Sequence, residues 1–451
     1  MRRLHCTAFA LLAALTACGG DPTASSPTIV LISLDTVRAD NLSCYGGPDG
    51  ATPNLDAFAA VADRHESCVS TAPWTLPSHA SMFTGLFPFE HGTQTFLPGQ
   101  GHRGDNVFAL HGRFETLAEA LEERGYATGG IVANSIYLRP GLGLEQGFDV
   151  WDVRREPGRR VTERALAWLA GTEAAGAPRF LFVNYLDAHR PYATGRPDDR
   201  ARARLDELID QVMVEGQEPG ALGDEVRALH QRAVTQLDQE IGRFLHDLRQ
   251  MGLFEDALVI VTADHGEAFG EHGVVEHSKD VYEELVRVPL LVKRPGQTRG
   301  EVVAACASSV DVPGIVASAL EGDGGGALTE LFPRTPGSHP VVAENSYSRL
   351  RDLQRFGTRF HKRRRAIYRD GLKLVIDSTG EHELFDLGAD PGEARDLAAE
   401  RPDDVESLLR ADLEFTEPRR FQGDRALPAN LTSAEVQEMG ALGYGGDSES
   451  K

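Results

Sequence analysis

Cysteine, basic charge and long apolar runs are all scarce in this chain of 451 residues. Only five cysteines are present, and none has the paired spacing of a zinc site. Acidic residues outnumber basic ones by 68 to 46, and the resulting net charge of −22 disfavours general binding to nucleic acid. No apolar run after the first 20 residues is long enough to span a bilayer, and no internal repeat is visible.

The first residues predict export. A charged start is followed by the short apolar run CTAFALLAAL, which is typical of a secretory signal. The run ends in LTAC, which resembles the lipobox of bacterial lipoproteins, where lipid is attached to the cysteine after cleavage. We therefore expect a signal peptide at residues 1–17, a lipidated Cys18 and a tether at 18–27. A soluble secreted protein cut at a nearby small residue is the alternative.

Lipid attachment would place the protein in the bacterial cell envelope, and Gly19 after the cysteine favours the outer membrane. Loss of Arg2 and Arg3 with the signal would take the net charge to −24. Three cysteines then remain outside the N-terminal segment, and an odd number excludes full pairing. A Cys44–Cys68 disulfide and buried free thiols both stay open.

Five apolar runs rich in β-branched residues predict strands buried on both faces: residues 28–35, 127–134, 179–187, 257–264 and 288–295. Helical patterns such as TLAEALEERG and QLDQEIGRFLHDLRQM stand beside them. Strands alternating with helices predict an α/β fold with a mostly parallel sheet between two helical layers. The chain is long enough for one large domain and a smaller one.

The pattern changes at residues 322–337, which are rich in glycine and proline and predict a boundary or a long loop. We expect a large domain at 28–325 and a smaller α+β subdomain at 338–440. Short runs such as HPVVAENS, RRAIYRDGLKLVIDS and HELFDL predict a small antiparallel sheet there, followed by a packing helix. Residues 441–451 are expected to be disordered.

Three of the predicted strands end in polar residues: Asp35 in SLDT, Asp187 and His189 in NYLDAH, and Asp264 and His265 in TADHGE. Ligands and catalytic groups of open α/β sheets gather at the carboxyl ends of strands. Asp35, Asp264 and His265 would offer two carboxylates and one imidazole to a divalent cation.

Thr75 stands in APWTLPSHASMFTG, where a turn framed by prolines leads into a predicted helix. Its hydroxyl could bind the same ion, and a metal would lower the pKa of that hydroxyl and turn a weak alcohol into a nucleophile. The first backbone amides of this helix would point toward an anionic ester bound beside the hydroxyl. Oxygen donors with a single imidazole favour calcium, manganese or magnesium over zinc.

Four ordered motifs resemble the sulfatase family of the alkaline phosphatase superfamily: SLDTVRADNLSCYG with TPNLD, TLPSHASMFTG, TADHGEAFGEHG, and YEELVRVPLLVKRPG. The resemblance covers nearly the whole mature chain, including ELFDLGADPGEARDLA near its end. It implies an alkaline-phosphatase-like three-layer sandwich with a central, mostly parallel mixed sheet, and a metal at the strand ends.

The resemblance also implies roles for individual residues. Asp35, Asp264 and His265 match metal ligands, and Thr75 occupies the nucleophile position. His189 matches a histidine that contacts the substrate or the leaving group. In HGVVEHSKD, either His277 or Lys279 matches a basic group that faces the oxygens of the ester.

Three departures from the family pattern bear on function. The nucleophile motif, which in sulfatases is close to C-x-P-S-R and matures to formylglycine, reads T-L-P-S-H here. Threonine is a secondary alcohol and could not be oxidised to an aldehyde. The arginine position is taken by His79, which would titrate nearer neutrality. The paired aspartates of the first strand are replaced by Asp35-Thr36, which removes one anionic ligand.

These departures favour a metal-dependent hydrolase of phosphate esters, above all a phosphodiesterase, with Thr75 as direct nucleophile. A sulfatase that acts on sulfated glycans without formylglycine is the second hypothesis. The third is a lipid-anchored binding protein with a decayed site. A transferase that takes a phosphorylated headgroup from a lipid is the fourth. The sequence does not indicate an oligomeric state.

Other polar residues have simpler interpretations. His272 in GEHG and His102 are expected to be turn or surface histidines, and Trp74 is expected to pack against the nucleophile turn. The basic segment HKRRR at 361–365, together with Arg349, Arg351, Arg355 and Arg359, is interpreted as a solvated, charge-balancing segment. An anion-binding rim beside the site is the alternative.

Overall fold

A computed structural model describes residues 26–95, 107–172, 176–192, 199–322, 325–423 and 425. An eight-stranded sheet forms its centre, in the order β11-β2-β10-β7-β1-β6-β4-β5. The strands are β1 (Ile29–Leu34), β2 (Asp63–His65), β4 (Ala127–Val132), β5 (Val150–Val153), β6 (Arg179–Tyr185), β7 (Leu258–Ala263), β10 (Leu290–Lys293) and β11 (Val302–Val303).

Each of the five predicted apolar runs forms a strand of this sheet. β1 is buried along its whole length because it lies between β6 and β7, both parallel to it, with Ile29 opposite Phe180 and Leu258. β10 runs antiparallel to β7 and to β2. The sheet is therefore mixed and mostly parallel, which confirms the prediction.

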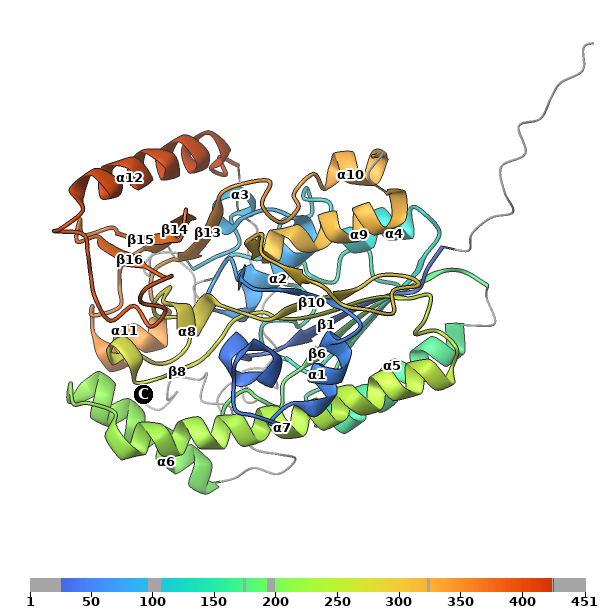
Figure 1. The fold of residues 1–451 in the computed structure, drawn as a ribbon, viewed down its shortest axis with the longest axis horizontal. Coiled ribbons are helices and arrows are strands. Elements are labelled where there is room, and N and C mark those ends of the chain that lie inside the picture. Colours follow the sequence, from blue (N-terminus) through green and yellow to red (C-terminus); the bar gives the residue numbers. More distant parts are fainter. Residues whose placement is uncertain are drawn as a thin grey trace, which may run out of the picture.

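Helices cover both faces of the sheet (Figure 1). One layer contains α1 (Pro53–Ala59), α5 (Gly158–Thr172), α6 (Asp199–Ile209) and α7 (Gly220–Gln250). The other contains α2 (Thr75–Thr84), α4 (Leu117–Glu122) and α9 (Val312–Glu321). This three-layer arrangement was expected, although α7 begins well before the periodic segment QLDQEIGRFLHDLRQM from which it was predicted.

A second, antiparallel sheet lies in the C-terminal part, formed by β13 (Val341–Asn345), β14 (Arg364–Arg369), β15 (Leu372–Asp377) and β16 (Glu383–Asp386). Helix α12 (Pro402–Thr416) packs on it, as predicted. Phe415 of α12 contacts Phe87 and Phe89 beside α3 (Pro88–His91), with ring centroids 5.7 and 6.0 Å apart. The C-terminal part therefore packs against the chain just after the helix that begins at Thr75.

The Gly- and Pro-rich segment between the two parts holds a short helix, α10 (Ala327–Leu331), where a boundary or loop was expected. The helix forms because the Glu321 carboxylate accepts hydrogen bonds from the backbone N–H groups of Leu328 and Thr329. The remaining elements are β3 (Cys68–Val69), β8 (Ala268–Phe269), β9 (Val275–Glu276), α8 (Glu283–Val286), α11 (Leu350–Phe356) and β12 (Ala307–Ser308).

Cys44, Cys68 and Cys306 are free thiols. Within the described ranges, no helix combines the length and the apolar character that crossing a membrane requires. The predicted signal peptide, Cys18, His102 and the tail at 441–451 lie outside the described residues.

Candidate active site

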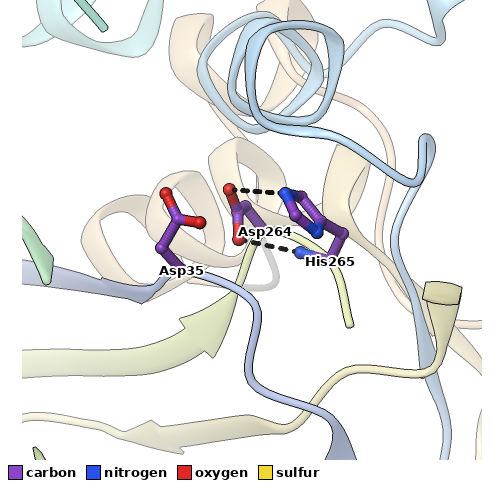
Figure 2. Close-up of side chains that lie close together, drawn as sticks. All are labelled: Asp35, Asp264 and His265. Carbon is purple, nitrogen blue, oxygen red and sulfur yellow. Dashed lines mark hydrogen bonds and ion pairs between the residues drawn. The ribbon is translucent and has the colours of Figure 1, made fainter. Parts of the chain in front are cut away.

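Asp35, Asp264 and His265 meet at the carboxyl ends of β1 and β7. Because these two strands are parallel neighbours in register, the residues that follow them leave the sheet side by side. One ligand atom from each of the three side chains lies within 4.8 Å of the others, and all three residues are fully buried. Figure 2 shows the side chains converging.

The electrostatics of this cluster fit a cation. Burial, together with the charge of Asp264, raises the pKa of Asp35 to about 7. Burial likewise raises the pKa of Asp264 to about 7, although backbone amides of Thr36 and His265 donate to it. Oδ1 of Asp35 and Oδ2 of Asp264 are buried without a hydrogen-bond partner. A bound cation would supply the missing partner to both oxygens.

The imidazole of His265 is also arranged as a ligand. Its Nδ1 lies 2.9 Å from the carbonyl oxygen of Gly266, which only accepts, so Nδ1 carries the proton. Nε2 is left with a lone pair, and it lies 3.4 Å from Oδ2 of Asp264. The cluster thus offers two carboxylate oxygens and one ring nitrogen to a cation.

Thr75 places its hydroxyl at the same point. It is the first residue of α2, because Trp74 before it is extended, with φ −164°. Oγ1 of Thr75 lies 3.4 Å from Nε2 of His265 and 3.4 Å from Nδ2 of Asn134. The N-terminus of a helix favours negative charge, so an anionic ester bound beside this hydroxyl would be stabilised.

Two residues of the TLPSH motif fix α2 to the strand ends. The hydroxyl of Ser78 donates to the carbonyl oxygen of Asp264 over 2.7 Å. Nδ1 of His79 donates to the carbonyl oxygen of Thr75 over 2.8 Å, and the Ser33 hydroxyl on β1 donates to Nε2 of His79 over 3.0 Å. His79 thus acts through the backbone that carries Thr75.

The sequence predicts that His79 titrates near neutrality, and this prediction is wrong. Burial lowers its pKa to about 3, and the neutral ring is consistent with one nitrogen donating and the other accepting. Nδ1 is 3.7 Å from Oδ2 of Asp264. A positive charge from an arginine at this position is therefore replaced by a neutral ring.

Asn134 contacts the cluster of Asp35, Asp264 and His265, although it was not among the predicted site residues. Its Nδ2 donates to Oδ2 of Asp35 over 2.8 Å and reaches the Thr75 hydroxyl, so it links the two groups. The backbone N–H of Asn134 in turn donates to Oδ1 of Asn184 on β6. Asn134 directly follows the run ATGGIVA, so the rule that selected Asp35 and Asp264 would also have selected it.

Thr36 turns its hydroxyl away from the cluster. The residue has a left-handed backbone, with φ +63°, and its Oγ1 donates to the carbonyl oxygen of Asp35 over 2.7 Å. Its N–H donates to Asp264, and its carbonyl accepts from His230. Thr36 therefore orders the ligand loop but offers no side-chain oxygen where related proteins carry a second aspartate.

His189 and His277 lie beside His265. The rings of His265 and His277 have centroids 4.6 Å apart, and those of His189 and His277 are 5.3 Å apart. Nζ of Lys279 donates to the carbonyl oxygen of His277 and to a carboxylate oxygen of Glu276. Of the two basic groups that the sequence left open, His277 is the one whose ring adjoins the cluster.

Arg349 brings positive charge to the same place from the C-terminal part. It is 3% exposed, and it donates to Oγ of Ser278 over 2.6 Å and to the hydroxyl of Tyr137 over 3.2 Å. Together with burial, its charge lowers the pKa of His265 and of His277.

The interpretation of the basic segment as solvated is therefore wrong for Arg349. It is also wrong for Arg364, which is 3% exposed and paired with Asp280 and Asp377. Arg355 fits the interpretation better, because it is exposed and pairs with Asp210 at the surface.

Comparisons with known proteins identify the family of the chain. A family model described as Sulfatase matches residues 27–322. The ulvan-active sulfatase of Formosa agariphila is 26% identical over 323 residues, which are 66% of this chain and 61% of that relative. The N-acetylglucosamine-6-O-sulfatase of Bacteroides thetaiotaomicron is 22% identical, and the alignment covers 90% of each of the two chains.

Among solved structures, the phosphonate monoester hydrolase of Agrobacterium radiobacter aligns with a TM-score of 0.65 and 20% identity. The alignment covers 86% of this chain and 96% of that chain. The two proteins therefore share their fold over almost their whole length.

Proposed function

The chain belongs to the sulfatase family of ester hydrolases, in the alkaline phosphatase superfamily, and from this membership we propose a metal-dependent hydrolase of phosphate or sulfate esters that uses Thr75 as its nucleophile. The observation that carries the proposal is the position of the Thr75 hydroxyl, 3.4 Å from Nε2 of His265 at the start of α2. Among the esters, we favour phosphate diesters.

The residues that would hold the ion are Asp35, Asp264 and His265, with the Thr75 hydroxyl beside them. A bound divalent cation, of the calcium, manganese or magnesium kind, would lower the pKa of that hydroxyl and neutralise charge on the ester. The protein itself orients the hydroxyl through Asn134, which holds Oγ1 of Thr75 and Oδ2 of Asp35 with one amide group.

The proposed reaction has two steps, formation and hydrolysis of a covalent ester on Thr75. Oγ1 of Thr75 forms a bond to phosphorus, the bond from phosphorus to the leaving oxygen breaks, and the proton of the Thr75 hydroxyl leaves with the departing alcohol. Water then cleaves the phosphothreonine ester, which restores the hydroxyl and releases the phosphate product. We assign His189 and His277 to the ester oxygens and leaving group, and Arg349 to stabilising the negative charge of the substrate.

The class of ester follows from the nucleophile. A threonine cannot mature to an aldehyde, whereas phosphoryl transfer needs positioning and charge neutralisation more than a special nucleophile. Sulfated glycans are the second candidate, supported by the relative named N-acetylglucosamine-6-O-sulfatase. A phosphorylated glycan or a lipid headgroup would meet the same residues.

The decisive experiment compares an aryl phosphate diester, an aryl phosphate monoester and an aryl sulfate, with each cation added in turn. We expect the diester to react fastest, and Thr75→Ala to lose at least about 10³-fold in kcat. Thr75→Ser, which keeps a hydroxyl, is the matched control, and rapid quenching of the parent should reveal phosphorylated Thr75 by mass.

Other results point elsewhere. Full diesterase activity in Thr75→Ala would remove the nucleophile from the proposal. A faster aryl sulfate would establish the sulfatase alternative. No turnover of any of these esters by metal-loaded protein would favour the binding protein with a decayed site.

We also propose that the protein is exported and anchored by lipid on Cys18, since a site that acts on envelope glycans or headgroups would be held near them. Cell fractionation tests this: the parent should be found with membranes, and Cys18→Ala should be released. A parent protein already in the soluble fraction would contradict the anchor.

A further inference from the structure

A second cluster of metal-binding side chains lies apart from the one described above. It consists of His272, Glu284 and Glu393, and one ligand atom of each lies within 4.8 Å of the others. His272 lies in the turn between β8 and β9, Glu284 in the first turn of α8, and Glu393 in the loop after β16. Two neighbouring segments and a third, remote one from the C-terminal part therefore converge on one point.

Glu284 has a carboxylate oxygen that no group in the described structure satisfies. The residue is 7% exposed, and its Oε1 is buried without a hydrogen-bond partner. Its other oxygen, Oε2, faces Nε2 of His272 across 3.8 Å, which is too long for a hydrogen bond. A buried polar atom without a partner is costly to desolvate, so such an atom calls for a ligand.

The charges around the cluster leave an excess of carboxylate. Lys373 serves two neighbours, with Nζ 2.7 Å from Oε1 of Glu393 and 3.0 Å from Oε1 of Glu283. Glu271 is neutralised separately, by Arg38. One ammonium thus serves two carboxylates, those of Glu283 and Glu393, and a third, Glu284, has a ligand atom within 4.8 Å of that of Glu393. A cation bound there would neutralise charge that Lys373 divides between two groups.

The remaining ligands are already oriented. The ring of His272 stacks on Tyr282, with centroids 3.9 Å apart and planes inclined by 12°, which holds the imidazole in place. Oε2 of Glu393 accepts the backbone N–H of Glu283 over 2.6 Å, which fixes that carboxylate. The His272 side chain is 18% exposed, so an ion can enter from solvent.

We propose that His272, Glu284 and Glu393 form a second site for a divalent cation, which joins the β8–β9 hairpin to the C-terminal part. Two carboxylates and one imidazole are the same donor set as at the first site, and Zn²⁺ is the probe of choice because nitrogen and oxygen donors bind it more tightly than manganese or the alkaline-earth ions. His272 lies in a turn, as the sequence predicts, at the edge of this cluster.

The consequence of such a site is mechanical. β9 ends at Glu276, directly before His277, so an ion at the turn between β8 and β9 would hold the strand that delivers His277. Tyr282, just before α8, packs its ring on Phe385 of β16 and donates its hydroxyl to Glu383, and Figure 1 shows α8 beside the C-terminal elements. The ion would therefore brace the candidate active site against the C-terminal part, whichever ester is hydrolysed.

Zinc binding is measured in a chain from which the first site has been removed. The double variant Asp35→Asn/Asp264→Asn is dialysed against Zn²⁺, and bound zinc is counted per chain. We expect that adding His272→Asn lowers the count by one per chain or weakens that zinc at least tenfold. Asparagine suits the left-handed backbone of His272, which has φ +52°, so this variant should fold.

Two further variants make the result specific. Glu284→Gln keeps the size of the side chain and changes a residue of α8 instead of the turn between β8 and β9. It should abolish binding of the same zinc ion. His246→Asn, at an exposed position on α7, should leave the count unchanged. The proposal is overturned if the double variant binds no zinc, or if His272→Asn and Glu284→Gln bind it as tightly as their parent. Because activity is not measured, failure here is separate from failure of the proposed reaction.

Discussion

Oε1 of Glu267 lies 2.9 Å from Nδ1 of His277, and both residues are buried. The second carboxylate oxygen of Glu267 accepts a hydrogen bond from the hydroxyl of Tyr192 over 3.1 Å. With Nδ1 occupied, Nε2 is the ring nitrogen of His277 that remains for a substrate. Glu267 is therefore a positioning residue for His277.

Glu267→Gln should lower kcat by about 10–100-fold, the cost typical of losing a carboxylate that orients a functional histidine. KM should change less, because the ester still finds the same charges. Steady-state kinetics on the best substrate measures both. Tyr192→Phe removes only the other bond to Glu267 and should have a smaller effect. Equal losses in the two variants would mean that Glu267 serves general packing instead.

Thr36→Asp should strengthen binding of the cation at the first site at least tenfold, because it restores a second carboxylate to the loop that carries Asp35. The left-handed backbone at this position suits aspartate better than threonine, which is β-branched. Calorimetric titration with calcium, manganese and magnesium checks this. Thr36→Asn, which has the same shape without the charge, is the control; an equal gain there would point to relief of backbone strain.

Removal of metal with a chelator should abolish hydrolysis and lower the unfolding temperature, because Asp35 and Asp264 would then face each other with unpaired oxygens. Adding back single cations in turn should identify the ion that restores the rate. Scanning calorimetry of Asp35→Asn/Asp264→Asn provides the control, since this variant should lose less stability on chelation than the parent. Undiminished activity after exhaustive chelation would contradict a metal-dependent reaction.

Asp377→Asn should destabilise the C-terminal sheet by about 1–3 kcal/mol at neutral pH. Oδ2 of Asp377 accepts from Arg364 over 3.0 Å and pairs with Lys362 over 2.6 Å. Asparagine would place an NH₂ donor against these donors. Urea unfolding measures the difference, and Asp370→Asn, at an exposed position with one weak ion pair, should have almost no effect.

The same pair of proteins should show a defined pH dependence. Burial alone would raise the pKa of Asp377, but its bonds to Lys362, Thr379 and Arg364 outweigh burial and hold the pKa below its usual range. The native carboxyl thus stays ionised where the unfolded one takes up a proton. Its stabilisation is complete above about pH 5 and declines progressively as the pH falls through the pKa of the unfolded carboxyl toward the lower pKa of the folded one, so the difference from Asp377→Asn should shrink from pH 5 downward. A difference that is constant down to pH 3 would contradict the ion pairs.

The sequence alone determined the sheet and the polar cluster at its strand ends. Short apolar runs rich in β-branched residues favour strands buried on both faces, and parallel neighbouring strands bring their carboxyl ends together. The rule that polar residues follow these ends therefore placed Asp35, Asp264 and His265 in one cluster, and the TLPSH motif placed Thr75 at a helix start. These conclusions needed only local patterns and the geometry of a parallel sheet.

Tertiary structure decided everything that depends on burial or on contacts between distant segments. The neutral state of His79 follows from its complete burial, and Glu267 matters because it meets His277. Arg349 lies against the site because the C-terminal part folds back over the strand ends. No local pattern encodes these pairings, because each arises only when separate segments exclude water from the same volume.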